Sequence, residues 1–263
     1  MSEETILFEK QGGIATITLN APDKGNAIDM PFVHRLFEIA MRCDLDPSIR
    51  CVVLTARGKL FCAGGDITLM QSAGDNMAGI LSELAGNLHM AVTRLARMSK
   101  PLLCLVNGAA AGAGLGLAVM GDVVLAARSA KFSVAYGAIG LTPDGGLSFL
   151  LPRLVGLRKA QELMLTNRRV AADEAEAMGL ITRAVDDEAL AEEGAKMAAL
   201  LADSAVGAIG SVRNLLLGSY GASIEVQMEM EARSIARQGG GPEGREGVAA
   251  FLGKRKADFS SAR

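Results

Sequence analysis

The segment LLCLVNGAAAGAGLGLAVMGD, residues 102–122, decides the fold of this chain. It opens with the apolar run Leu102–Val106, which is typical of a strand buried on both faces. Small residues from Asn107 to Gly116 then predict a turn, and an apolar helix follows. The uncharged run Leu102–Gly121 is long enough to span a bilayer, but its five glycines favour a buried strand, a turn and a helix instead.

The same order, a buried strand and then a small-residue turn, occurs once more upstream. The strand expected at Cys51–Thr55 leads to a turn at residues 61–67. Two further strands are expected at Ile14–Leu19 and Val123–Ala126, and an amphipathic helix at Ile80–Met98. Strands that alternate with turns and helices in this way predict an α/β fold with a mostly parallel sheet.

The last part of the chain has a different pattern, because strand signals stop after about residue 187. Helical periodicity continues through four more segments. We therefore expect a core that carries the functional site over residues 1–190, and a helical C-terminal region over residues 191–263 that packs on a neighbouring subunit. The four expected helices are Ala189–Leu201, Ile209–Leu217, Ser223–Ala236 and Gly244–Leu252.

The composition argues against several classes of protein. A formal net charge of −2 gives no basic surface that would bind nucleic acid by charge alone. Two histidines and four cysteines, with no C-x-x-C pair, leave a zinc or haem site almost without ligands. The start of the chain, MSEETILFEK, is polar and acidic, unlike a signal peptide. Together with the free thiols, it favours a cytoplasmic protein that has no membrane partner.

The first small-residue turn, FCAGGDI at residues 61–67, leaves the backbone open to close approach by a ligand. Asp66 is a good N-cap for a helix that begins near Ile67. Free backbone N–H groups in such a turn are donors for an anionic oxygen. Taken alone, the segment is better interpreted as an ordinary connection between a strand and a helix.

The second turn, at residues 107–116, fits two familiar phosphate-binding motifs poorly. Gly112 and Gly114 match the start of the dinucleotide fingerprint G-x-G-x-x-G/A, but Leu117 stands at its third position, and a clear acidic residue about twenty positions further on is missing. A P-loop is excluded because no Gly-Lys-Ser/Thr follows. Two small-residue turns after two strands can instead converge on one oxygen from two sides.

Together with further segments, the two turns carry a specific resemblance. From Ile14 to Phe259 the chain resembles the crotonase (enoyl-CoA hydratase/isomerase) superfamily, in the order and the spacing of its motifs as well as in their residues. The matching segments are LNAPDKGNAID (19–29), FCAGGDI (61–67), KPLLCLVNGAAAGAGLGLAVMGD (100–122), AKFSVAYGAIGLTPDGG (130–146), LPRLVG (151–156), LTNR with AADEAEAMGLI (165–181) and AAFLGKRKADF (249–259).

The resemblance implies a fold, an assembly and a class of substrate. The fold is an α/β spiral of β-β-α units with a C-terminal α-helical oligomerisation region. The assembly is a homotrimer or a hexamer. The substrate is an acyl-CoA thioester, so coenzyme A is part of the substrate and no separate cofactor is expected.

The resemblance also implies the residues of the site. Two backbone N–H groups bind the thioester oxygen in this family, and residue by residue they fall on Ala63 and Ala113. One such donor typically lowers the barrier by roughly 3–4 kcal/mol. The further contacts with the substrate fall on Lys24, Asn26, Ala27, Gly64, Gly65, Asp66, Ile67, Gly112, Tyr136, Leu141 and Pro143, and on a C-terminal patch of Lys254, Lys256 and Phe259.

The acid–base residue departs from the pattern of the hydratases. Hydratases of this family use two glutamates, whose positions match Gly116 and Tyr136 here. Asp144, in the motif IGLTPDGG, resembles instead the aspartate of enoyl-CoA isomerases, including those that act on ring-epoxide CoA esters. One carboxylate that removes a proton and returns it to another carbon suits such a reaction. On local sequence alone, a turn-forming residue is the better interpretation of Asp144. A hydratase that uses Asp144 and a silent CoA-ester binding protein remain as alternatives.

His89, on the helix expected at Ile80–Met98, is a second candidate catalytic residue, although a boundary histidine is the plainer interpretation. The related halobenzoyl-CoA dehalogenases have a histidine here and an aspartate at the place of Asp144. They also use a tryptophan near Tyr136, and this chain has none. Cys62 has no histidine nearby in sequence and is interpreted as a small buried residue. The acyl pocket is expected near Met70, Ile80, Leu84, His89, Tyr136 and Leu141.

Overall fold

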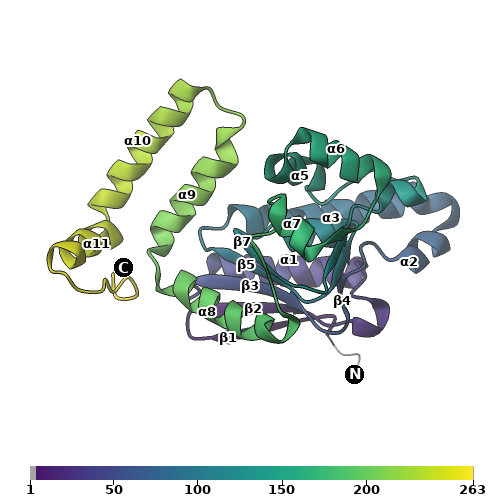
Figure 1. Cartoon of the computed structure of the whole chain (residues 1–263), viewed down its shortest axis with the longest axis horizontal. Helices are drawn as coiled ribbons and strands as arrows, with labels where there is room; N and C mark the ends of the chain where they lie inside the picture. The colour runs from purple at the N-terminus through teal and green to yellow at the C-terminus, as the bar shows by residue number, and fades with distance from the viewer. Residues whose placement is uncertain (1–3, 263) are drawn as a thin grey trace.

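The computed structural model describes residues 4–262, and two β-sheets with covering helices form its core (Figure 1). The strands are β1 (Ile6–Gln11), β2 (Ile14–Leu19), β3 (Cys51–Ala56), β4 (Leu60–Cys62), β5 (Leu102–Val106), β6 (Ala109–Ala111), β7 (Val123–Ala127), β8 (Lys131–Ser133), β9 (Val170–Ala171) and β10 (Arg183–Val185). The α-helices are α1 (Met30–Leu45), α2 (Ile67–Ser72), α3 (Met77–Arg97), α4 (Ala113–Val119), α5 (Leu147–Val155), α6 (Leu157–Thr166), α7 (Ala172–Ala177), α8 (Leu190–Asp203), α9 (Val206–Ser219), α10 (Ile224–Gly240) and α11 (Pro242–Leu252).

The larger sheet has six strands in the order β1-β2-β3-β5-β7-β10. All its pairs are parallel except the β1–β2 hairpin. The α/β fold and the mostly parallel sheet are thus confirmed, and the four strands predicted from the sequence lie within one residue of their expected bounds. Apolar runs of this kind are buried on both faces of a parallel sheet, so they stand out clearly in a sequence.

The smaller sheet, in the order β4-β6-β8-β9, is a feature that the sequence did not reveal. Its strands β4 and β6 lie inside segments that were predicted as turns. A strand of three residues is too short to show an alternation of apolar and polar residues. Pairing with the neighbouring strands specifies these strands instead. Each of β3, β5 and β7 is followed by a short strand of this sheet and then by a helix, which is the expected spiral of β-β-α units.

The core fills both faces of the large sheet. Side chains that alternate along β3 separate the two faces: Val52 and Leu54 pack with α1 and α3, whereas Cys51 and Val53 pack with α8. The helix predicted at Ile80–Met98 is α3, and its buried residues face the sheet. These contacts fix the position of α3, which passes beside both small-residue turns.

The C-terminal helices divide into two groups. Helix α8 packs on the large sheet through Leu190, Ala198 and Ala202, so it belongs to the core, and the boundary predicted at residue 190 lies too early. Helices α9, α10 and α11 extend away from the core as an arm (Figure 1). Across residues 4–262, no single helix is both long and apolar enough to cross a membrane; the bent pair Asp187–Asp203 and Val206–Ser219 meets that test together, by length and composition only.

Candidate active site at two converging turns

The two small-residue turns lie against each other. Strand β4 pairs with β6, and each strand ends at a glycine with positive φ, Gly64 at 96° and Gly112 at 55°. A Cβ added to Gly64 would lie 2.9 Å from the carbonyl oxygen of Ala111 and 3.5 Å from the Cα of Gly112. Only glycine allows both this conformation and this close approach. The expected convergence of the turns is therefore present.

Two backbone N–H groups remain free where the turns meet. Gly64 accepts a hydrogen bond from Ile28, and Asp66 donates one back to Ile28, so that Gly65 lies between them with its N–H unused within residues 4–262. Ala113 is the first residue of α4, where an N–H has no acceptor inside the helix. Gly65 and Ala113 line the same cavity.

The assignment of the first donor to Ala63 is wrong. The Ala63 N–H donates to the carbonyl oxygen of Gly25 at 2.9 Å, and the residue is exposed outside the cavity. The donor that the geometry offers is two residues further on, at Gly65. The sequence motif showed which turn was involved, but the choice of N–H depends on how the neighbouring residues 25–28 pair with that turn.

The cavity beside these donors has a volume of about 280 Å³. Its walls are mostly apolar, and α3 supplies five of the residues. Of the six residues expected in the acyl pocket, Ile80 and His89 do not line it. The lining residues are Ile28, Gly65, Met70, Leu81, Ser82, Leu84, Ala85, Leu88, Ala113, Tyr136, Leu141, Thr142 and Asp144.

Asp144 is the single carboxylate among the lining residues. One of its oxygens accepts a hydrogen bond from the hydroxyl of Tyr136, across the loop between η3 (Tyr136–Ile139) and α5. Burial and the neighbouring Asp144 carboxylate raise the pKa of Tyr136. The phenol therefore stays a neutral donor, and its hydrogen bond fixes the Asp144 side chain at the wall of the cavity.

His89 contacts the same loop from α3. Its Nε2 accepts a hydrogen bond from the Gly145 N–H at 3.0 Å and lies 3.6 Å from Asp144 Oδ2. Because a backbone N–H can only donate, Nε2 carries no proton in this arrangement. The histidine was predicted as a catalytic candidate that faces the acyl pocket; it contacts instead the backbone behind Asp144.

The space for a side chain at residue 116 is tight. Gly116 is buried in α4, and a Cβ at this position would lie 3.3 Å from the carbonyl oxygen of Gly145. The turn that carries Asp144 therefore packs where a longer side chain would begin.

Comparison with known proteins agrees with this geometry. The family model described as Enoyl-CoA hydratase/isomerase matches residues 9–262. The chain belongs to the enoyl-CoA hydratase/isomerase family. It is 36% identical over 258 residues to 1,2-epoxyphenylacetyl-CoA isomerase of Escherichia coli (strain K12), with 98% of each chain covered. It is 33% identical over 263 residues to crotonyl-CoA hydratase of Syntrophomonas wolfei, with 99% of this chain and 100% of that protein covered.

Solved structures give the same result for the fold. The structure of an enoyl-CoA hydratase from Mycobacterium smegmatis superposes with a TM-score of 0.92 at 30% identity, and the match covers 98% of this chain and 100% of that chain. Family relatives therefore include both an isomerase and hydratases, and the reaction of this member must be argued from its own site.

Two residues predicted as substrate contacts of this enoyl-CoA hydratase/isomerase family member use their side chains for structural hydrogen bonds, and contact of their backbone with coenzyme A stays a prediction. Asn26 is fully buried; its Nδ2 donates to the carbonyl oxygens of Arg57, Leu60 and Phe61, and its Oδ1 accepts from Ala21. These bonds fasten the loop to β4, so its side chain cannot reach a ligand. Asp66 accepts from the N–H groups of the first turn of α2 and is the N-cap that the sequence predicted.

Other predicted contacts do not line the cavity. Lys24 and Ile67 are exposed, whereas Ala27 and Pro143 are half-buried. A Cβ added to Gly112 would lie 4.0 Å from the ring of Tyr136. Their contact with coenzyme A stays a prediction.

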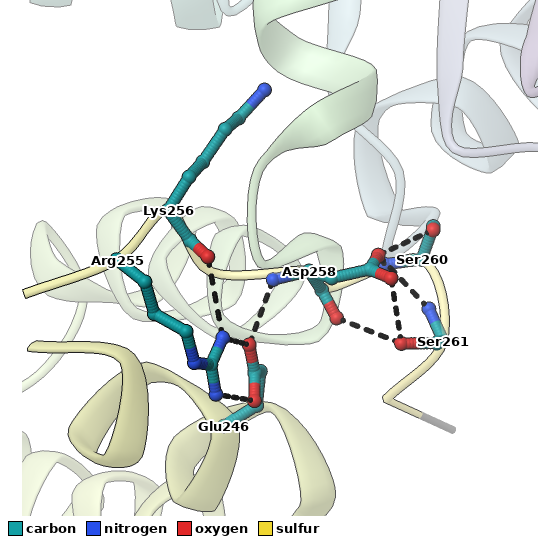
Figure 2. A network of polar contacts seen from close by, with 6 residues as sticks. All are labelled: Glu246, Arg255, Lys256, Asp258, Ser260 and Ser261. Carbon is teal, nitrogen blue, oxygen red and sulfur yellow. Dashed lines mark hydrogen bonds and ion pairs between the residues drawn. The ribbon is translucent and has the colours of Figure 1, made fainter. Parts of the chain in front are cut away.

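The basic patch predicted near the end of the chain lies on the arm. Glu246 pairs with Arg255 and accepts the Asp258 N–H, and Asp258 in turn accepts from Ser260 and Ser261 (Figure 2). Lys256 pairs with Asp203 at 3.0 Å, and Phe259 packs on Gly247. Since no described residue after Asp144 lines the cavity, this patch does not line the acyl cavity of its own chain.

Cys62 lies beneath the first turn and takes no part in the site. Burial raises the pKa of its thiol to about 12, and its Sγ donates to the carbonyl oxygen of Asn26 at 3.0 Å. The thiol is therefore neutral and occupied, as the sequence interpretation of a small buried residue expected.

Proposed function

We propose that this protein isomerises the double bond of an enoyl-CoA thioester, with Asp144 as the base. The observation that carries the proposal is a single carboxylate, Asp144, on the wall of an apolar cavity that also holds the free N–H groups of Gly65 and Ala113. The 1,2-epoxyphenylacetyl-CoA isomerase relative supports isomerase chemistry. A carboxylate and two donors are the parts that enolate chemistry needs.

The reaction proceeds through a dienolate. The thioester oxygen of a 3-enoyl-CoA accepts hydrogen bonds from Gly65 and Ala113, and the Asp144 carboxylate removes a proton from C2. Negative charge then spreads from C2 and C4 onto the thioester oxygen, where the two donors stabilise it. Asp144 returns the proton to C4, so the double bond moves to C2–C3 and the enzyme regains its starting state.

Two features of the cavity support the proposed role of the Asp144 carboxylate. The Tyr136 hydroxyl holds one oxygen of Asp144, which leaves the other oxygen for proton transfer. The apolar walls formed by Leu84, Leu88 and Leu141 exclude water from the acyl group, and this favours the return of the proton over the addition of water. With glycine at residue 116 and tyrosine at residue 136, the cavity offers no second carboxylate to deliver water.

Coenzyme A belongs to the substrate in this proposal, and the site needs no separate cofactor. We also propose that the chain assembles into a homotrimer or hexamer, because the arm exposes a row of large apolar side chains that a neighbouring copy would cover. Those side chains include Leu216, Tyr220, Ile224, Ile235, Phe251 and Leu252. Sedimentation of the full chain tests the assembly, and a monomer would contradict it.

Asp144→Asn tests the reaction. With trans-3-hexenoyl-CoA as substrate, we expect turnover to fall about 100- to 10,000-fold, the usual contribution of a general base. Binding of the thioester, measured by calorimetry, is expected to stay close to wild type because the two donors remain. Asp75→Asn, an exposed carboxylate in the turn before α3, is the matched control and should keep full activity.

Three results would overturn the proposal. Full turnover by the Asp144→Asn variant would remove Asp144 from the mechanism. A wild-type protein that adds water to 2-enoyl-CoA but leaves 3-enoyl-CoA unchanged is a hydratase. A wild-type protein that binds these thioesters but converts none of them is a binding protein that has kept the two donors.

A further inference from the structure

Asp144 is the first residue of a tight turn. The Asp144 carbonyl oxygen accepts a hydrogen bond from the Leu147 N–H at 3.1 Å, and the two residues between them have positive φ, 61° at Gly145 and 82° at Gly146. Two central residues in the left-handed region are the pattern of a type I′ turn, and glycine adopts it without strain. The turn hydrogen bond fixes the carbonyl side of the peptide that joins Asp144 to Gly145.

The N–H side of the same peptide is fixed by α3. The Gly145 N–H donates to Nε2 of His89 at 3.0 Å. The Asp144–Gly145 peptide plane is therefore held at both ends, by Leu147 from within the turn and by His89 from outside. Because the Asp144 side chain leaves the backbone next to this plane, the orientation of the plane sets the direction in which the carboxylate points.

External support of this kind matters for a turn made of glycines. Gly145 and Gly146 have no side chains to anchor them, and glycine has more accessible backbone conformations than any other residue. Helix α3 is a firm support, because Leu84, Leu88, Ala91 and Leu95 are buried in the core. The helix that forms the acyl wall is thus also the helix that holds the base.

We propose that His89 is a positioning residue: its neutral imidazole acts as a hydrogen-bond acceptor that fixes the Asp144–Gly145 peptide and so aims the catalytic carboxylate. The proposal rests on the proposed function, since it assumes that Asp144 is the base. His89 takes no proton from the substrate. Its Nε2 is occupied by the Gly145 N–H, and at 3.6 Å it is too far from Asp144 Oδ2 for a hydrogen bond.

Three substitutions separate an acceptor from a proton carrier. In His89→Gln, the side-chain amide oxygen can take the place of Nε2 and accept the same N–H, but the amide cannot transfer protons. In His89→Asn, the amide is one bond shorter and falls short of Gly145. In His89→Leu, the side chain has a similar size and no acceptor at all. His89 is partly exposed, so the exchanges do not open a cavity in the core.

With trans-3-hexenoyl-CoA, we expect His89→Leu and His89→Asn to lose about 100-fold in kcat while KM stays within about threefold, because a misplaced base affects the chemical step more than binding. We expect His89→Gln to keep kcat within about fivefold of wild type. A structural role alone would not produce this split between kcat and KM, nor the rescue by glutamine.

Two outcomes would overturn the inference. Unchanged kcat in His89→Leu would show that the peptide needs no acceptor. An equal loss in His89→Gln and His89→Leu would show that the imidazole itself carries protons. If His89→Leu fails to fold, the Gln and Asn variants alone decide, because they differ only in reach. Asp144→Asn is measured in parallel. If this variant keeps full turnover, the proposed function has failed. If it loses turnover while the His89 variants keep wild-type kcat, only the positioning role of His89 is rejected.

Discussion

The hydroxyl of Tyr136 donates to the carboxylate of Asp144, and the two residues thereby join the short η3 helix to the turn before α5. By its resemblance to the family, Tyr136 matches the position of a glutamate in the hydratases. In the proposed mechanism, a tyrosine at this position supports the Asp144 carboxylate and supplies no second carboxylate. Among the described residues that line the cavity, one carboxyl group, Asp144, is therefore held by a neutral donor.

This pair predicts an unusual dependence of stability on pH for Tyr136→Phe. At neutral pH the free energy of unfolding of the variant should be about 1–3 kcal/mol lower than that of wild type, because the Asp144 carboxylate loses its buried donor. Burial raises the pKa of Tyr136 in the folded state, so above the ordinary tyrosine pKa of about 10 the unfolded chain releases this proton and the folded chain keeps it. Wild type then loses stability with rising pH through this group, and the variant does not.

Thermal melting of both proteins between pH 7 and pH 11 measures the effect. We expect the gap in melting temperature to narrow above pH 10. The four buried cysteines also have raised pKa values, but they are the same in both proteins and cancel in the difference. A gap that stays constant over the whole range would contradict the assignment.

Ala113→Pro removes one of the two proposed donors. Proline is well suited to the first position of a helix, which Ala113 occupies in α4. The residue before it, Gly112, has a backbone conformation that only glycine adopts easily. The loss of one donor to a developing oxyanion costs about 100- to 1,000-fold in kcat. Steady-state kinetics with trans-3-hexenoyl-CoA measures it, and Ala113→Gly, which keeps the N–H, is the control. A folded proline variant with wild-type kcat would show that this N–H does not bind the thioester oxygen.

Sequence reasoning located the two turns and Asp144 because short motifs encode them directly. It misplaced the first N–H donor at Ala63 and did not foresee the buried, hydrogen-bonded side chain of Asn26, because both features depend on partners far away in sequence. The N–H of Ala63 is used by Gly25, and the amide of Asn26 is used by carbonyl groups of residues 57–61. Such hydrogen bonds form where two loops pack against each other in space. No local sequence pattern specifies how the two loops pack.

The same reason explains what was missed around His89 and the small sheet. The helix of His89 was clear from its apolar period, and the histidine lies off the apolar face, but its partner is a backbone N–H. A backbone group has no signature in sequence. Likewise, the small residues of β6 read as a turn, and only pairing with β4 and β8 makes them a strand.

Substitutions at Gly116 test whether hydration can be restored at this site. Gly116→Glu should add no hydratase activity, because the new side chain begins 3.3 Å from the Gly145 carbonyl oxygen and pushes away the turn that holds Asp144. Gly116→Ala adds the Cβ alone. Alanine favours a helix by roughly 0.5–1 kcal/mol over glycine, so we expect stability to hold or rise while kcat falls about tenfold as the turn shifts.

Formation of 3-hydroxyacyl-CoA from 2-hexenoyl-CoA and isomerisation of 3-hexenoyl-CoA are followed side by side, together with the melting temperature. Hydration by the glutamate variant would refute the view that this space is too tight for a longer side chain. Unchanged isomerisation in Gly116→Ala would mean that the turn moves aside without moving its carboxylate.

Arg213 anchors the arm to the core and also secures the end of α3. Its side chain is 6% exposed; it pairs with Asp122 at 2.8 Å and donates to the carbonyl oxygens of Lys100 at 2.8 Å and Leu95 at 3.0 Å. The carbonyl oxygen of Leu95 lies in the last turn of α3, where carbonyls have no partner inside the helix and a cation is favoured. The arginine therefore acts on the same helix that forms the acyl wall and carries His89.

Arg213→Met should destabilise the protein by about 3–5 kcal/mol, because it leaves the Asp122 carboxylate and the carbonyl oxygens of Leu95 and Lys100 without the arginine. Urea unfolding at a fixed protein concentration measures the loss. Arg233→Met is the matched control: it breaks an ion pair with Glu229 on the arm whose arginine is 80% exposed, so stability should change little. If the two variants unfold at the same urea concentration, then Arg213 contributes no more than a surface charge, and the arm is held by its apolar contacts alone.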